Sequence, residues 1–368
     1  MANGILHKVS DICDKASSNI AQNKLEGLDG AYPIYGASGY IQNVDFYHRD
    51  KPYIGIVKDG SGVGRVNIYP AHSSLLGTMQ YILPKPGYDI GYVAYVLKSL
   101  KLASFAAGAA IPHIYFKDYG QCLVNVPSLP EQERIVAELD LLSGVIEKQK
   151  VQLKELDSLA QSIFYDMFGD PVMNEKQWTT CSISDVCSSI VRGPFGSALK
   201  KEFFVEPSSS SYKVYEQKHA IQKDASIGSY YIDEERFRTL KRFEVKPGDI
   251  IMSCSGTIGE LFEIPQGAER GIMNQALLKF TLSDVICKVF FLYAMEFIKH
   301  SFETKGTGLQ NIGAVGTIKK TMIALPDLPL QQSFATKIEA IEQQKARINA
   351  SIAETQKLFD YTMDKYFG

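Results

Sequence analysis

Residues 126–132 read Val-Pro-Ser-Leu-Pro-Glu-Gln, and residues 325–331 read Leu-Pro-Asp-Leu-Pro-Leu-Gln. Each copy of this motif opens a stretch that closes on Phe-Gly, at 168–169 and at 367–368. One offset of 199 residues relates the two stretches from end to end, because it takes Pro127 to Pro326 and Gly169 to Gly368. The chain therefore contains an internal repeat.

Each copy predicts one long helix. Ser128 and Asp327 are placed as N-caps, and a proline follows in the first turn, where its missing N–H costs little. Apolar residues then recur at alternating three- and four-residue steps, which is the pattern of a coiled-coil seam. The predicted seam residues are Leu139, Leu142, Ile146, Leu153, Leu156 and Ile163 in the first helix, and Ile338, Ile341, Ile348, Ile352 and Phe359 in the second.

Two matched seams in one chain most simply pack against each other. Polar Gln149 and Lys345 interrupt them, and lone polar residues in a seam help to fix register. The alternative is a pair of unrelated amphipathic helices on separate cores. The shared length, cap and ending of the two stretches argue against it.

Composition sets broad limits on the class of protein. A chain of 368 residues with 45% hydrophobic content can form two core-bearing domains. Its net charge of −2 neither announces nor excludes a nucleic-acid binder, since a duplex needs one basic face rather than a basic protein. The six cysteines form no Cys-x-x-Cys pair, so we expect reduced thiols. Without a signal pattern or a long apolar span, we expect a soluble cytoplasmic protein and no membrane contact.

The segment before each long helix predicts short strands and glycine turns, because short β-branched and aromatic runs are punctuated by glycine. A strand at 52–57 enters the glycine turn at 58–65, and a strand in 247–254 enters a similar turn at 255–259. The second copy is longer, and we place the additional residues near its start, in a stretch that includes 192–197 and the serine run at 208–211. We therefore predict an α+β fold with two tandem mixed α/β domains, 1–127 and 170–326, each followed by a spacer helix, 128–169 and 327–368.

At this point the residues resemble a known family, the DNA specificity subunits of Type I restriction–modification systems. The resemblance covers essentially the full length. It rests on the doubled helix entry, the Gly-Asp-Ile-Ile…Ser-Gly-x-x-Gly strand and turn at 248–259, the Gly-Pro-Phe-Gly-Ser stretch at 193–197, and the loops at 108–114 and 306–312. Each motif alone is weak, but their order, found twice, is quite specific.

The resemblance implies two target-recognition domains, each reading one half of a bipartite site in double-stranded DNA. The long helices would form an antiparallel coiled coil that spaces the domains, with a pseudo-twofold relation between the repeats. They would also dock two methyltransferase subunits, which hold S-adenosylmethionine and methylate adenine, and a separate motor-nuclease subunit would join for restriction. This chain itself would hold no cofactor.

Basic residues beside backbone-exposing glycines suit phosphate contacts, and several polar side chains can read base edges. Each of them is otherwise an ordinary solvated charge, a turn cap or one face of a strand. The predicted DNA-binding residues are Lys58, Ser61, Arg65, His113, Arg192, Ser197, Lys200, Lys201, Tyr215, Lys218, Arg236, Arg238, Arg242 and Asn311.

Sequence motifs argue against catalysis by this chain. It lacks the Asn/Asp-Pro-Pro-Tyr/Phe motif of amino-methyltransferases, since residues 170–173 read Asp-Pro-Val-Met. Neither glycine turn matches a phosphate-binding loop or a nucleophile elbow, and the six histidines lack metal-ligand spacing. The alternative from another class is a non-catalytic coiled-coil adaptor that binds protein or another ligand; an enzyme of unrecognised type comes third. Salt-sensitive duplex binding would separate the first two, because phosphate contacts release counterions.

Overall fold

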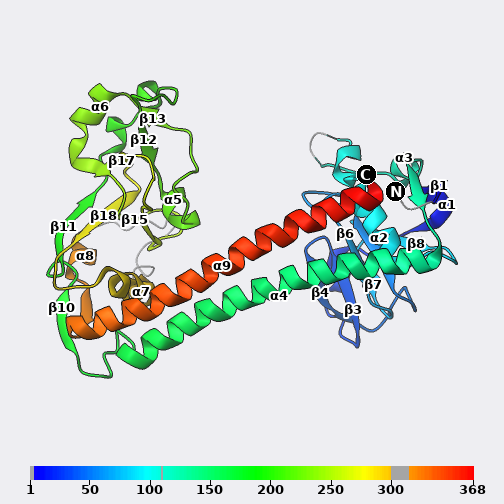
Figure 1. Cartoon of the computed structure of the whole chain (residues 1–368), viewed down its shortest axis with the longest axis horizontal. Coiled ribbons are helices and arrows are strands. Elements are labelled where there is room, and N and C mark those ends of the chain that lie inside the picture. Colours follow the sequence, from blue (N-terminus) through cyan, green and yellow to red (C-terminus); the bar gives the residue numbers. More distant parts are fainter. Residues whose placement is uncertain (1–3, 109–110, 300–314) are drawn as a thin grey trace. The chain divides into compact units, whose positions relative to one another are not determined.

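The computed structural model describes residues 4–108, 111–299 and 315–368 (Figure 1). The chain forms two compact units, which we call the first unit (1–152 with 348–368) and the second unit (153–347). Each unit holds one mixed α/β portion and a part of both long helices, α4 (Leu129–Phe168) and α9 (Leu328–Phe367). The predicted fold class is confirmed. The predicted domain bounds stay a prediction, because the units divide the long helices between them.

The first unit has three small sheets, in which β1 pairs with β9, and the other strand orders are β2-β8-β5-β6 and β4-β3-β7. Its elements are β1 (Ile5–Lys8), α1 (Val9–Ile12), β2 (Cys13–Ser17), η1 (Gln22–Leu25), β3 (Tyr32–Gly36), β4 (Gly39–Val44), β5 (Tyr53–Val57), β6 (Val66–Tyr69), β7 (Ser74–Leu75), β8 (Met79–Pro84), α2 (Ile90–Ser99), η2 (Leu102–Phe105), α3 (Phe116–Tyr119) and β9 (Leu123–Val126).

The second unit repeats this plan: β10 pairs with β19, and the other strand orders are β11-β18-β15-β16 and β13-β12-β17-β14. Its elements are β10 (Thr179–Ser182), β11 (Cys187–Arg192), η3 (Gly196–Ala198), η4 (Lys201–Phe203), β12 (Tyr212–Tyr215), α5 (Gln217–Gln222), β13 (Tyr231–Ile232), α6 (Glu234–Thr239), η5 (Lys241–Phe243), β14 (Glu244–Val245), β15 (Ile250–Ser253), β16 (Leu261–Glu263), β17 (Gly271–Met273), β18 (Leu277–Leu282), α7 (Lys288–Ile298), α8 (Val315–Lys320) and β19 (Met322–Leu325).

The repeat extends to individual strand pairings. β3 runs parallel to β7 in the first unit, and β12 runs parallel to β17 in the second, while the β1–β9 and β10–β19 pairs are both antiparallel. Most of the additional length of the second copy lies after β12 rather than near its start, because α5, α6, η5 and β14 lie between β12 and β15 in addition to β13, the counterpart of β4. The expected position of the insertion was therefore wrong in its main part. None of the helices in the described ranges is long and apolar enough to cross a membrane.

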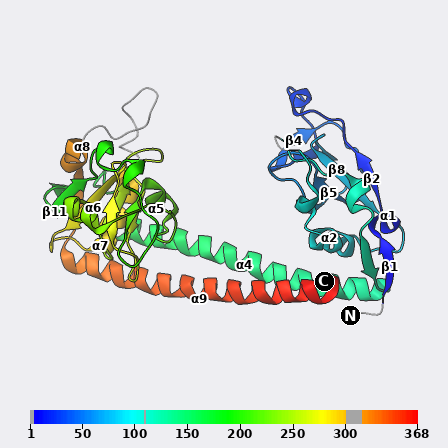
Figure 2. The same cartoon turned by 90° about the horizontal axis from the view of Figure 1, so that it is seen from above.

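In both units a short helix packs the sheet against the long helices. In the first unit α2 lies between the β2-β8-β5-β6 sheet and the neighbouring ends of α4 and α9 (Figure 2). The ring centres of Tyr92 in α2 and Phe367 lie 5.4 Å apart, and the Tyr95 hydroxyl donates to Asp140 over 2.6 Å. In the second unit Phe290 of α7 meets Phe168 of α4 at a ring separation of 4.8 Å. The long helices are thus part of each hydrophobic core.

Within each unit the two long helices run antiparallel. In the first unit the Tyr366 hydroxyl donates to Glu138 over 2.7 Å, and the Gln149 amide donates to Ser351 over 2.7 Å. In the second unit the Lys345 ammonium lies 2.8 Å from Asp157. Burial alone would lower the pKa of Lys345, but its ion pairs with Asp157 and Glu342 outweigh burial and raise it. The two polar seam residues therefore each have a partner on the other helix.

All predicted seam side chains are buried or half-buried, although their neighbours along the helices are mostly exposed. Leu139, Ile146, Ile338 and Ile341 are buried. At the end of α9, residues 365–368 line the same pocket as Gly4 and Leu6. The start of the described chain therefore lies near the end of the second long helix.

The glutamine of each repeated motif joins a long helix to its globular portion. Gln132 accepts from the Asp89 N–H over 2.9 Å and donates to the Pro127 carbonyl over 3.0 Å. Gln331 does the same in the second unit, accepting from the Cys287 N–H over 2.8 Å and donating to Pro326 over 2.7 Å. Asp89 and Cys287 are the N-caps of α2 and α7. Because both glutamines are buried, water cannot replace these bonds.

We expect Gln331→Met to lower the free energy of unfolding of the second unit by roughly 2 kcal/mol, because a buried donor and a buried acceptor lose their partner while the volume is kept. Trp178, the single tryptophan, reports on this unit in urea titrations followed by fluorescence. The matched control is Gln332→Met at the exposed neighbouring position. Equal unfolding midpoints for the two variants would contradict the proposed role.

Candidate nucleic-acid interface

In the first unit a glycine turn joins β5 to β6 and carries three of the predicted DNA-binding residues. Gly64 has a φ of 85°, and a Cβ there would lie 2.5 Å from the Ala103 nitrogen, so this position requires glycine. The loop that holds His113 is tied to the same turn, because the Gly60 N–H donates to Pro112 over 3.0 Å. Turn and loop therefore form one local surface.

The side chains of this surface differ in their freedom. Ser61 and Arg65 are exposed and line a pocket of about 570 Å³ with residues from η1 and β3. Lys58 lies 3.9 Å from Asp59, and His113 bonds to the same carboxylate. Ser61 and Arg65 are thus available to a ligand, whereas Lys58 and His113 share an acidic partner.

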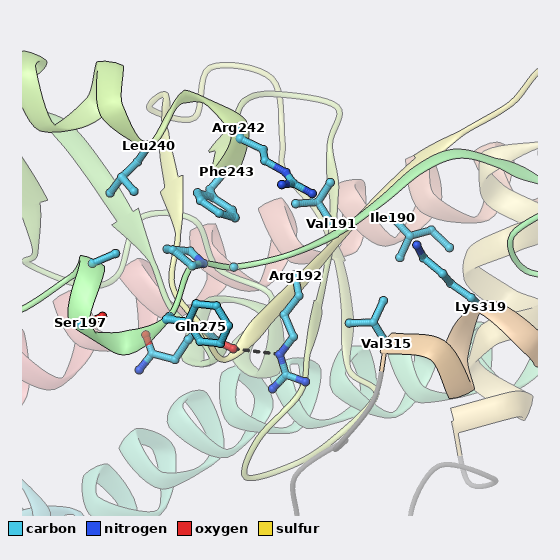
Figure 3. Close-up of a pocket in the computed structure, with 14 residues that line it drawn as sticks. Ile190, Val191, Arg192, Ser197, Leu240, Arg242, Phe243, Gln275, Val315 and Lys319 are labelled. Atoms are coloured by element: carbon cyan, nitrogen blue, oxygen red, sulfur yellow. Dashed lines mark hydrogen bonds between the residues drawn. The ribbon is translucent and has the colours of Figure 1, made fainter.

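In the second unit, segments far apart in the sequence line one pocket of about 870 Å³ (Figure 3). Arg192 ends β11, Arg242 lies in η5, and Lys319 belongs to α8. The remaining lining residues are Ile190, Val191, Gly193, Pro194, Phe195, Ser197, Ala198, Leu240, Phe243, Gln275 and Val315. We call this pocket the basic groove.

The charge of the basic groove has one sign, since none of its described lining residues is acidic. Arg192 is oriented by a bond from its Nε to the Gln275 carbonyl over 3.2 Å (Figure 3). Within residues 4–108, 111–299 and 315–368, neither Arg242 nor Lys319 forms an ion pair with a carboxylate. Unpaired cations around a groove attract polyanions such as the phosphates of DNA.

Several predicted basic contacts are instead engaged within the protein. Arg236 donates from Nε to the Ala198 carbonyl over 3.2 Å and lies 4.1 Å from the centre of the Phe203 ring. Arg238 pairs with Glu234 and Lys218 with Glu216, both over 2.6 Å. Lys200 lies 3.6 Å from Glu202, and Lys201 is exposed. Among the basic residues at 236–242 that the structure describes, Arg242 alone lines the basic groove.

Two of the predicted DNA-binding residues, Tyr215 and Asn311, are not found on the surface that the structure describes. Tyr215 is fully buried, and its hydroxyl donates to the Glu269 carbonyl over 2.6 Å. Burial raises the pKa of Tyr215, and the nearby Glu269 charge raises it further. We therefore remove Tyr215 from the candidate interface: β12 is covered on both faces, so its tyrosine faces the core. Asn311 lies outside the described residues.

Sequence reasoning missed Gln275, Lys319 and Phe195 as members of the groove. Gln275 and Lys319 have no local signal, because they are far from Arg192 in the sequence and line its groove only in the folded chain. Phe195 lies within the Gly-Pro-Phe-Gly-Ser motif at 193–197. The motif alone does not indicate that this side chain is exposed. Among the described residues, no group of three His, Cys, Asp or Glu side chains could hold a metal ion.

Comparison with known proteins identifies the family. A family model described as the Type I restriction modification DNA specificity domain matches residues 6–156 and 175–355, which is most of the chain. The chain belongs to this family. It is a DNA-recognition subunit and not an enzyme. The other specificity subunits of Type I systems are likewise non-catalytic. As such it binds DNA and works within a complex.

Relatives of the chain carry the same description. The MjaIX specificity subunit of Methanocaldococcus jannaschii is 22% identical over 316 residues, covering 77% of this chain and 69% of the relative. A Type I specificity subunit from M. genitalium superposes with a TM-score of 0.59 at 14% identity, covering 100% of this chain and 96% of that one. A chain from a study of Type I complex assembly gives 0.58 at 15% identity, covering 100% and 98%. These structures support the fold.

We expect Arg242→Ala and Lys319→Ala each to weaken duplex binding by the specificity subunit in its complex and to reduce the slope of log K against log salt concentration by about one. Fluorescence anisotropy across a salt series measures both quantities. Lys288→Ala is the control, since the Lys288 ammonium is already neutralised by Glu263 over 2.5 Å. A slope unchanged in both groove variants would show that neither residue contacts phosphate.

Proposed function

We propose that the two domains of this specificity subunit read the two halves of a bipartite site in double-stranded DNA. The supporting observation is that one strand topology occurs twice, with different side chains in equivalent places. A shared fold that carries different side chains suits the recognition of two different DNA sequences. In this proposal the first domain uses the surface of its glycine turn, and the second domain uses the basic groove.

Within each half-site the roles divide by chemistry. Arginine and lysine bind phosphates and fix the position of the protein on the duplex, and polar side chains read base edges. The proposed contacts are Lys58, Ser61, Arg65 and His113 in the first domain, and Arg192, Ser197, Lys200, Lys201, Arg242, Gln275 and Lys319 in the second. A secondary place goes to the residues that already have a partner within the protein, namely Lys58, His113, Lys200, Lys218, Arg236 and Arg238.

The long helices would set the gap between the two words. Between Leu139 and Ile163 the seam advances by 24 residues, which at about 1.5 Å per residue is roughly 36 Å. One turn of B-DNA separates half-sites by about 34–36 Å. A seam of this length suits two readers in successive major grooves on one side of a duplex.

One heptad inserted into both α4 and α9 at facing positions should lengthen the gap by about three base pairs, because seven residues rise about 10 Å and base pairs stack at about 3.4 Å. Mapping methylated adenines in cells that express the lengthened chain with its methyltransferase measures the gap. The two half-site words should stay the same. An unchanged gap would rule out a spacer role for the helices.

The helix pair would also dock the methyltransferase subunits. Glu138 and Lys365 influence each other electrostatically and mark one face of the pair in the first unit. Leu141 and Val145 lie three and seven residues beyond Glu138, at spacings that keep them on that face. Tyr361 and Leu358 lie four and seven residues before Lys365.

The exposure of these four side chains supports docking. Leu141 is 69% exposed and Tyr361 67% exposed, and Leu358 and Val145 are exposed as well. Large apolar side chains gathered on one exposed face favour a protein partner. We propose a methyltransferase subunit as this partner, with a second one at the equivalent face of the other repeat. S-adenosylmethionine would be held by those subunits, a motor-nuclease subunit would join for restriction, and the assembly would work in the cytoplasm, where cellular DNA is found.

We expect Leu141→Asp combined with Tyr361→Asp to reduce the complex from two methyltransferase subunits per chain to one, since charges would enter one docking face. Native mass spectrometry of the co-expressed complex counts the subunits directly. Gln356→Asp serves as the control, because Gln356 is exposed as well and lies five residues before Tyr361, about 140° away around the helix. Retention of both subunits by the double variant would exclude this face.

A further inference from the structure

The side chain of Phe195 is the most exposed large apolar side chain in the described part of the chain. It is 89% exposed, compared with 72% for Ile5, the next in order. Phenylalanine gains most when its ring is taken out of water, and in this chain the ring contributes almost nothing to a core. Its position at the edge of the basic groove therefore calls for a partner outside the chain.

The backbone that carries Phe195 is fixed, although the ring is not. The Gly193 N–H donates to Leu277 over 3.0 Å, and a Cβ on Gly193 would lie 1.8 Å from the Asn274 carbonyl oxygen. Glycine is required there because two backbone segments touch. On the other side of Phe195, the Ala198 N–H donates to the Phe195 carbonyl over 2.8 Å. Arg236 holds the Ala198 carbonyl in turn.

Three cations line the same groove as this exposed ring. Arg192, Arg242 and Lys319 line the same groove, and none of the described lining residues carries a negative charge. A protein partner that covered the groove would have to neutralise at least Arg242 and Lys319, which form no ion pair with a carboxylate within residues 4–108, 111–299 and 315–368. A duplex does so with its phosphates, and it presents apolar base surfaces between its two strands.

We propose that Phe195 is a base-contacting residue: its ring packs on bases of the half-site read by the second domain while the neighbouring cations hold the phosphates. This inference rests on the proposed function and adds the residue that gives that domain an apolar contact. Aromatic side chains contact thymine methyl groups or enter partly between base steps, and both contacts depend on the bases rather than on charge. Because the backbone is held in place, little ordering is needed when DNA binds.

The test uses the full chain in complex with its methyltransferase subunits. Methylated adenines are first mapped in cells to define both half-sites, and a fluorescent duplex carrying the mapped site is then titrated with wild-type, Phe195→Ala and Phe195→Leu complexes. We expect Phe195→Ala to bind roughly tenfold or more weakly, and Phe195→Leu to lie between the two. The salt slope should equal that of the wild type, since no phosphate contact is lost.

Mapping with the Phe195→Ala chain should show relaxed choice of bases in the half-site read by the second domain and an unchanged word in the other half-site. Met173→Ala is the matched control, because Met173 is 71% exposed in the same unit and does not line the basic groove. Equal thermal unfolding of all variants would show that any effect arises from binding.

Three results would overturn the inference. These are wild-type affinity together with an unchanged word in Phe195→Ala, a reduced salt slope in that variant, or loss of a methyltransferase subunit in place of loss of DNA. A wild-type complex that methylates no bipartite site would instead refute the proposed function, whatever Phe195 does. The two failures are therefore distinguishable.

Discussion

One buried glutamine amide in each unit joins a long helix to its globular portion. Gln132 and Gln331 each accept from the N-cap N–H of a short helix and donate to the carbonyl of the proline that directly follows the preceding strand. Three elements thus meet at one side chain: the strand, the short helix and the start of the long helix. Because a buried amide must satisfy both its donor and its acceptor, this junction fixes the direction in which each long helix leaves its domain.

The same junction explains how the two repeats can diverge without losing the fold. The strand orders, the parallel pairs and the helix entry are kept, while the second unit adds α5, α6, η5 and β14 after β12. Among these additions, η5 supplies Arg242 to the basic groove. The buried contacts that define the scaffold are left in place.

Features that depend on one segment of sequence could be predicted, whereas features that depend on contacts between distant segments could not. The helices and seams are periodic within one segment, so their phase could be read directly, and Gln149 and Lys345 each have a partner on the opposite helix. The groove could not be predicted, because Lys319, Gln275 and Arg192 are far apart in the sequence and line one pocket only in the folded chain. Tyr215 was predicted to bind DNA because alternating tyrosines give the same sequence pattern in a buried strand and in an exposed one. Arg236 and Arg242 belong to one basic run, yet Arg236 holds a backbone carbonyl within the protein.

The most direct test of the central claim is modified-base sequencing of DNA from cells that express the partner methyltransferase with and without this chain. The account predicts methyl-adenine at a split site with one fixed gap, and only when the chain is present. With a partner shown to be expressed and bound, the absence of new methylation, or methylation at an undivided site, would contradict two readers joined by one helix pair.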